Sequence, residues 1–391
     1  MSASVLRGAA AVAGVSEFHC KRGESGQTEL QLTLRAVLAA AADAGIDPGE
    51  IDGFVSYGGG ENDGTVVGSA LMVRRIRWSS MIWGGGGGGA AAAVTNAAVA
   101  IATGQADCVV VYRAMSQQDS GRLGYAKHHF DGQMLPHGVG SPAQACALRT
   151  QRMLEADGVP AEAVRALVLA DYAHAQRNPS AAAYGRPLDA AAYEASRMIV
   201  EPYRLFDCSR ENDGAVALIL VRADRAADLT HEPVYVLAGA QGAAPGYAVD
   251  TENDIDYSSA GFGASSGVAA QLWTDAGIGP ADVDVVQVYE NFSGSGVAAL
   301  IDHGLCPAGP AAATVLTVEN LTAPGGALPV NTSGGNLADS FVNGMGLAVE
   351  AVRQLRGTSA NAVPGARISL FIGGPMAALV SSVLFCVRAA L

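Results

Sequence analysis

The sequence predicts an α/β fold made of two homologous halves, in which helices cover buried sheets. Two observations support this fold class. Ala-rich helical segments alternate along the chain with short Val- and Ile-rich runs, and apolar, β-branched strands of this kind are typical of sheets buried on both faces. In addition, residues 43–57 recur in similar form at residues 275–289, which indicates an internal duplication.

Hydrophobic periodicity gives the elements of the first half in order. They are a strand in the N-terminal segment, a helix over 30–44, a strand over 54–57, a helix over 90–104, a strand over 107–112, helices over 142–157 and 161–176, and a strand over 215–221. A charged stretch near residues 224–234 ends this half, and Val234–Leu237 begins the second. We therefore expect an N-terminal half at 1–230, which includes a loop region at 113–210, and a C-terminal half at 231–391.

The repeat has the same plan in both copies. Residues 43–48 (DAGIDP) lead to Tyr57, and residues 275–280 (DAGIGP) lead to Tyr289 at the same offset. Each copy predicts a helix end, a Gly cap, a Pro turn and then a strand.

Composition excludes several classes of function. The 391 residues carry 24 Lys and Arg against 37 Asp and Glu, and no block of five or more basic residues is present, so nucleic acid and anionic membranes are unsuitable partners. Lys21 and Lys127 are the only lysines, which argues against a Schiff-base mechanism. The uncharged run Trp78–Ala106 is rich in Gly and Ala and predicts a buried helix, not a membrane span. Six scattered cysteines without CxxC spacing indicate reduced thiols, no metal site and a cytoplasmic location.

Several motifs, in order along the chain, resemble those of the thiolase superfamily. They are Ala102–Asp107, Val330–Gly335 and Phe371–Gly374, together with the two repeat copies. Further segments resemble the lipid-transfer-protein or sterol-carrier-protein-x branch of this superfamily, which includes bacterial steroid side-chain aldolases. These segments are Val111–Ala114, Glu201–Cys208, Glu211–Ala215 and Val352–Gly357. The resemblance implies a layered α-β-α-β-α core of duplicated halves with a loop insertion.

The chain departs from the thiolase pattern at the catalytic positions. Counting by the family's spacing places the nucleophilic Cys at Gly87, the His at Phe341 and the second Cys at Phe371. The family's Asn that positions a water falls at Tyr289. Since neither nucleophile nor acid/base is present, acyl-enzyme chemistry is excluded. The branch usually carries Tyr where this chain has Phe341.

What the resemblance implies instead is an aldolase, a carbon–carbon lyase that cleaves a β-hydroxyacyl-CoA by a retro-aldol reaction of the steroid side-chain type. No covalent intermediate is needed for this reaction. One alternative is a non-catalytic subunit that binds acyl-CoA or scaffolds a partner. Another is a biosynthetic acyltransferase or an enzyme that forms a carbon–carbon bond.

Three consecutive residues after a predicted strand are candidate catalytic groups. Tyr289 is a candidate phenol for proton exchange with the substrate; in the alternative interpretation it only ends the strand, with its hydroxyl in solvent. Glu290 is interpreted as orienting Asn291 or a helix start, and its alternative is a surface carboxylate. Asn291 is a candidate donor to a thioester oxygen, and its alternative is a helix N-cap.

Two glycine segments are candidates for an oxyanion site. Gly87 and Gly88 lie in the run Gly84–Gly89 that opens a helix, and Gly373 and Gly374 follow a late strand. Exposed N–H groups at such places bind a developing negative charge. The alternatives are tight subunit packing for the first segment and a plain turn for the second.

The long loop of the first half holds further candidates for the general base. Tyr125 and His128 are the main candidates, and His129 and His137 lie nearby in the sequence; alternatively, all four belong to a solvated loop. Lys127 is a further candidate, as the amine of a Schiff base. Candidates for binding a CoA phosphate are Arg113, Arg122 and Arg204, each of which is alternatively a structural or solvated arginine.

We expect no cofactor in this chain, with a CoA thioester as substrate. The resemblance implies a small OB-fold, zinc-ribbon partner protein, which would hold any zinc, and a resulting heterotetramer. We also expect a twofold homodimer in which the strand near Asp107–Tyr112 pairs across the axis.

Overall fold

The computed structural model describes residues 4–58, 63–83, 86–116, 135–226, 228–243, 259–263 and 265–391. Within these residues the two halves share one mixed sheet with the strand order β3-β2-β4-β7-β1-β8-β11-β10-β9. The first half contributes β1 (Ala10–Lys21), β2 (Gly53–Tyr57), β3 (Trp78–Ile82), β4 (Cys108–Met115) and β7 (Asn212–Arg222). The second contributes β8 (Val234–Gly242), β9 (Val285–Val288), β10 (Ile368–Gly373) and β11 (Val380–Cys386). The expected boundary at residue 230 falls between β7 and β8.

The two halves repeat the same strand pattern. In the first, β2 is parallel to β3 and β4, and β7 is antiparallel to β4 and β1. In the second, β9 is parallel to β10, and β11 is antiparallel to β10 and β8. The halves meet where β1 pairs with β8 over the residue pairs Ala11–Tyr235 and Val12–Val234.

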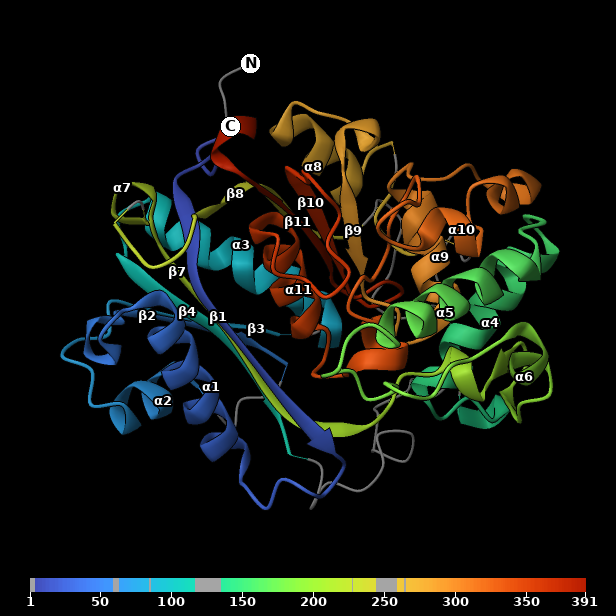
Figure 1. The fold of residues 1–391 in the computed structure, drawn as a ribbon, viewed down its shortest axis with the longest axis horizontal. Coiled ribbons are helices and arrows are strands. Elements are labelled where there is room, and N and C mark those ends of the chain that lie inside the picture. The colour runs from blue at the N-terminus through green and yellow to red at the C-terminus, as the bar shows by residue number, and fades with distance from the viewer. Residues whose placement is uncertain are drawn as a thin grey trace.

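The helices form layers on both sides of the strands (Figure 1). They are α1 (Glu29–Ala44), α2 (Gly64–Ala70), α3 (Gly89–Ala102), α4 (Pro142–Glu155), α5 (Ala161–Ala175), α6 (Ala190–Glu194), α7 (Ala223–Ala226), α8 (Val268–Ala276), α9 (Ser293–Asp302), α10 (Val318–Leu321) and α11 (Met345–Arg356). The outer helices α1 and α8 each cover the strands of their own half, whereas α3 and α11 contact strands of both halves. Since α3 and α11 lie between the strands of the two halves, and α1 and α8 lie outside them, this arrangement is the expected layered α-β-α-β-α core.

The internal repeat forms the same structure twice. Helix α1 ends at Ala44, and Gly45 caps it with φ 70°. Helix α8 ends at Ala276, and Gly277 caps it with φ 64°. A 3₁₀ turn that begins with a proline then leads into β2 in the first copy and β9 in the second. The left-handed φ explains why both copies carry glycine at this position.

Helix α3 is enclosed by the core, which explains its lack of charge. Eleven of its 14 residues are buried, and it packs between strands of the two halves. The sequence prediction of a buried helix is therefore confirmed. Within the residues that the structure describes, no helix is long and apolar enough to cross a membrane.

The expectation that the strand near Asp107–Tyr112 pairs across a twofold axis is wrong. In the structure, β4 is hydrogen-bonded on one side to β2 and on the other to β7, so it has no free edge. The edge strand of the first half is β3. Strand order depends on contacts between distant segments, and the local pattern of β4 does not contain them.

The region between β4 and β7 forms an insertion beside the second half. It contains α4, α5 and α6 and the small hairpin β5 (Met198–Val200) and β6 (Tyr203–Arg204). Figure 1 shows these helices gathered on the side where β9 and α9 lie. Helix α5 contacts α9 and the short helical segment Gly335–Asp339, so the insertion adjoins the predicted site residues of the second half.

Candidate active site

Tyr289 lies at the end of β9 and points into the protein. Its backbone N–H donates to the carbonyl oxygen of Ile372 on β10 over 2.8 Å, which continues the ladder between β9 and β10. Its hydroxyl donates to Oδ1 of Asn343 over 3.2 Å. The residue is 4% exposed, and burial raises the pKa of Tyr289 well above its usual value. The alternative of a hydroxyl in solvent is therefore wrong.

The Tyr289 ring is held between two glycines. A Cβ atom at Gly87 would lie 2.2 Å from both Cε2 and Cζ of the ring, and a Cβ atom at Gly344 would lie 2.2 Å from Cδ2. Real Cβ atoms do not approach other atoms so closely. The ring thus occupies the space into which a side chain at residue 87 would extend, and a cysteine there is incompatible with Tyr289 in this position.

The two predicted glycine segments meet at the start of α3. A 3₁₀ turn over Gly86–Gly88 precedes this helix. A Cβ atom at Gly374 would lie 2.0 Å from the backbone nitrogen of Gly88, and one at Gly373 would lie 3.2 Å from the carbonyl oxygen of Gly87. The contact at Gly374 excludes any side chain there. The oxyanion role of these backbone N–H groups stays a prediction.

Ser381 on β11 fixes this junction and was missed by the sequence analysis. Its hydroxyl donates to the carbonyl oxygen of Gly88 and accepts from the backbone N–H of Ala92 over 2.9 Å. A lone serine in a strand carries no signal for such a role. The contact joins the second half to the first turn of α3.

Glu290 is fully buried, so the alternative of a surface carboxylate is wrong. Its carboxylate accepts from the backbone N–H of Asn336, from the Asn336 side chain over 3.1 Å and from the backbone N–H of Leu337 over 3.3 Å. It therefore stabilises the helical segment Gly335–Asp339, not the start of α9.

Asp171 on α5 lies beside Glu290, and both are buried. A Cβ atom at Gly335 would lie 2.0 Å from Glu290 Oε1 and 2.9 Å from both Asp171 Oδ2 and Asn331 Nδ2, so these groups surround one point. Burial raises the pKa of Glu290 to about 7 and raises that of Asp171 as well. Two adjacent buried carboxyl groups are expected to share a proton.

Asn291 is not an N-cap. Helix α9 follows Phe292, and no side chain caps it. The Asn291 side-chain oxygen accepts from the hydroxyl of Ser295 over 3.4 Å, and its carbonyl oxygen accepts from the backbone N–H of Ser209 over 2.9 Å. A role toward a thioester oxygen stays a prediction.

The loop candidates Tyr125 and His128 lie outside the described residues, as do His129, Lys127 and Arg122. His137 is exposed in a 3₁₀ turn. The two described arginines are engaged with acidic side chains: Arg113 lies 3.7 Å from Glu29, and Arg204 lies 3.2 Å from Glu194. CoA phosphate binding by either arginine stays a prediction.

Phe341 lies next to Tyr289, with the ring centroids 6.1 Å apart. The position to which the family's spacing assigns an acid/base group therefore adjoins the phenol and carries no hydroxyl. Phe371 is buried in β10. Tyr57, the counterpart of Tyr289 in the first repeat copy, was not proposed as a site residue, although its matching offset was a usable signal.

The cysteines do not offer a reactive thiolate. All six are free; Cys108, Cys146, Cys306 and Cys386 are buried, as expected. Burial raises the pKa of the Cys146 thiol to about 11 and that of Cys108 to about 12. Within the described part of the chain, no group of three His, Cys, Asp or Glu residues could hold a metal ion.

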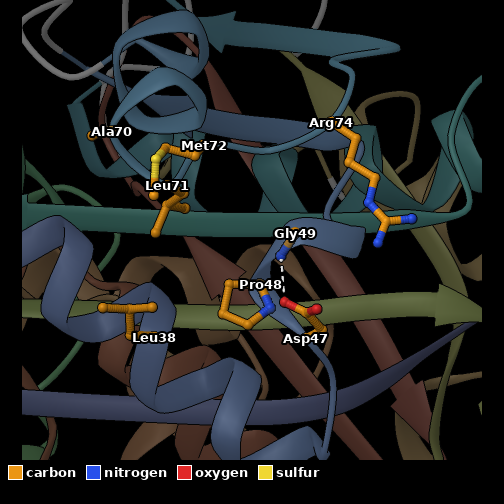
Figure 2. Close-up of a pocket in the computed structure, with 8 residues that line it drawn as sticks. All are labelled: Leu38, Asp47, Pro48, Gly49, Ala70, Leu71, Met72 and Arg74. Carbon is orange, nitrogen blue, oxygen red and sulfur yellow. Dashed lines mark hydrogen bonds between the residues drawn. The ribbon is translucent and has the colours of Figure 1, made fainter.

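A surface depression of about 500 Å³ lies away from this site (Figure 2). It is formed by α1, the Pro48 turn and α2, and Figure 2 shows Leu38, Pro48 and Leu71 facing it. None of the predicted site residues that the structure describes lines it.

Comparison with known proteins gives matches over nearly the whole chain. The family model described as "Thiolase C-terminal domain-like" matches residues 246–385. A 17-hydroxy-3-oxo-4-pregnene-20-carboxyl-CoA lyase from Mycobacterium tuberculosis is 36% identical over 95% of this chain and 97% of its own length. A steroid side-chain-cleaving aldolase from Thermomonospora curvata is 36% identical over 92% and 93%, respectively.

Solved structures agree with these matches. The structure named "Ltp2-ChsH2(DUF35) aldolase" superimposes with a TM-score of 0.90 at 33% identity and covers 99% of this chain and 100% of that one. Human mitochondrial 3-ketoacyl-CoA thiolase superimposes with a TM-score of 0.67 over 98% of this chain and 100% of that one. At 13% identity, the second match shows the fold alone.

Proposed function

Because this chain belongs to the thiolase-like family that includes the steroid side-chain-cleaving aldolases, we propose that it is a carbon–carbon lyase. Its substrate is a β-hydroxyacyl-CoA with a steroid or similar polycyclic group, and the reaction is a retro-aldol cleavage. The observation that carries the proposal is the Tyr289 ring, which fills the place beside Gly87 where a nucleophile would extend.

The reaction moves one proton from the β-oxygen to Cα, so no proton is gained or lost overall. A base removes the β-hydroxyl proton, the Cα–Cβ bond breaks, and its electron pair forms the thioester enolate while a ketone or aldehyde leaves. Backbone N–H groups near Gly87, Gly88, Gly373 and Gly374 stabilise the enolate oxygen. Since burial keeps the phenol protonated, Tyr289 is the acid that protonates Cα.

The base is a second group, because a protonated phenol does not accept the first proton. Phe341 adjoins Tyr289 and has no group that could do so. We propose that His128, or Tyr125 as a phenolate, removes the β-hydroxyl proton. The proton then returns from this base to the Tyr289 phenolate, which completes the cycle.

We also propose two kinds of association. A small OB-fold, zinc-ribbon protein binds this chain, and the solved "Ltp2-ChsH2(DUF35) aldolase" supports the proposal because its name gives two components. Two copies of this chain pair through the edge strand β3, so that a heterotetramer results. The thiols and the metabolic substrate favour a cytoplasmic location.

A non-catalytic, acyl-CoA-binding subunit is the second candidate, favoured by the phenylalanine at 341. Activity of the chain co-expressed with its partner protein distinguishes the two. The assay follows release of the ketone or aldehyde from a β-hydroxyacyl-CoA.

Tyr289→Phe removes the hydroxyl and keeps the ring, and should lower the cleavage rate about 10²–10⁴-fold. Tyr235→Phe, at a buried tyrosine of β8, is the matched control and should retain activity. Wild-type turnover by Tyr289→Phe would show that Tyr289 is not the acid, and complete inactivity of the wild-type pair would favour the binding subunit.

A further inference from the structure

A second tyrosine stands beside Tyr289 at the beginning of α3. Tyr57 ends β2, at the position in the first repeat copy that Tyr289 has in the second. A Cβ atom at Gly89 would lie 2.5 Å from Cβ of Tyr57, whereas one at Gly87 would contact the Tyr289 ring. The duplication thus places Tyr289 against the 3₁₀ turn before α3 and Tyr57 against the first residue of α3.

Both hydroxyl groups bind the same residue. The Tyr57 hydroxyl donates to the carbonyl oxygen of Asn343 over 2.7 Å, and the Tyr289 hydroxyl donates to Oδ1 of Asn343 over 3.2 Å. Asn343 lies in the turn before α11 and has φ 50°. A residue other than glycine rarely adopts this conformation, and asparagine does so more readily than most.

From this geometry we infer that Asn343 is the positioning residue of Tyr289, and that Tyr57 positions Asn343 in turn. The inference rests on the proposed function, because it assigns these two residues to the acid of that reaction. Asn343 Oδ1 accepts the hydrogen bond of the phenol before the substrate binds and so holds the hydroxyl group in place, and with the substrate bound the proton passes to Cα. The hydrogen bond from Tyr57 holds the backbone that carries this oxygen.

Tyr57 is placed differently from Tyr289: it contacts Gly89 of α3 and not Gly87, and we assign it no direct proton transfer. It is fully buried, and its proton is committed to a backbone carbonyl oxygen. Burial raises the pKa of Tyr57 further above its usual range. Its contribution therefore passes through Asn343.

The test is a double-mutant cycle on the chain in complex with its partner protein. Asn343→Gly removes the amide and leaves the positive φ unstrained, so it isolates the side chain. We expect kcat for β-hydroxyacyl-CoA cleavage to fall about tenfold, with KM changed less than about twofold. In the Tyr289→Phe background, Asn343→Gly should have no further effect, because the hydroxyl group that the Asn343 side chain positions is gone.

Tyr57→Phe should also lower kcat with little change in KM, whereas Tyr235→Phe should change neither. An equal loss from Asn343→Gly with and without the Tyr289 hydroxyl would overturn the inference. So would a wild-type kcat in Asn343→Gly.

A second measurement separates this inference from the proposed function. If the wild-type complex cleaves no β-hydroxyacyl-CoA, the four proteins of the cycle are compared by thermal unfolding. They are the wild type, Asn343→Gly, Tyr289→Phe and the double variant. The losses in melting temperature from Asn343→Gly and Tyr289→Phe should then be less than additive, because each removes the same hydrogen bond. Additive losses would overturn the link between the two residues whatever the protein does.

Discussion

Replacing Gly87 with alanine tests the central contact of the site. The added Cβ atom would lie 2.2 Å from two carbons of the Tyr289 ring and 2.7 Å from its hydroxyl oxygen. Carbon atoms in contact are normally about 3.5–4.0 Å apart, so the ring must move by more than about 1 Å. Gly344 lies against the ring on another side, where its own Cβ would be 2.2 Å from Cδ2, and this limits the retreat.

The expected loss follows from this confinement. Gly87 does not have a positive φ, so alanine strains no backbone angle, and steric overlap is the whole effect. Overpacking of a closed core usually destabilises by about 1–3 kcal/mol, and we expect Gly87→Ala to lie in that range. Because displacement of the ring also disrupts the hydrogen bond to Asn343, cleavage activity should fall as well.

Urea unfolding of the variant in three backgrounds checks the cause. The loss should persist in the Tyr289→Phe background, where the ring remains, and nearly vanish in Tyr289→Ala, where it is gone. Gly325→Ala is the matched control, since a Cβ atom there would meet nothing within 4 Å, and its stability should change by less than about 0.5 kcal/mol. An equal loss from Gly87→Ala with and without the ring would refute the reasoning.

Three further predictions concern the thiols, the buried carboxyl pair and assembly. Thiol alkylation of the folded chain should leave activity intact, since burial raises the pKa of thiols such as Cys146, and an acylated chain seen by intact mass would contradict this. The pKa of Glu290, raised by burial from 4.5 to about 7, makes the folded chain hold a proton that the unfolded chain releases. The contribution of this proton to the free energy of unfolding is complete below pH 4.5. It is lost as pH rises toward 7, by at most about 1.4 kcal/mol per pH unit. Glu290→Gln should flatten this decline in urea unfolding at several pH values, and an unchanged slope would argue against it. Sedimentation should give a dimer, and a mass of 39.6 kDa at micromolar concentration would contradict pairing through β3.

Local sequence signals were sufficient for most of the fold. The helix over α1, the strand β2 and the repeated turn after Gly45 and Gly277 follow from periodicity and cap residues, and the structure has them at nearly the expected bounds. The edge assignment of β4 failed because it depends on which distant strands become neighbours.

The candidate site was predictable only in part. Family spacing found Gly87 and Tyr289, and the structure brings them into contact. Asn343 and Asp171 were missed because their roles depend on contacts across the fold: Asn343 accepts from a residue of each half, and Asp171 reaches Glu290 from the insertion. The pair Asn343-Gly344 predicts a turn but not this role, and Asp171 lies in an ordinary helical pattern.

The central helices have a consequence for how the chain folds. Helix α3 belongs to the first half but packs against β8, β10 and β11, and α11 belongs to the second half but packs against β1 and β7. Each half therefore completes the core of the other, while among the described residues the strands of the two halves pair directly where Ala11 meets Tyr235 and Val12 meets Val234, between β1 and β8. A fragment cut near residue 230 would expose the apolar surface that its missing helix covers. The two fragments are thus expected to be insoluble apart and to recover structure when mixed, as complementary pieces of one cooperative unit.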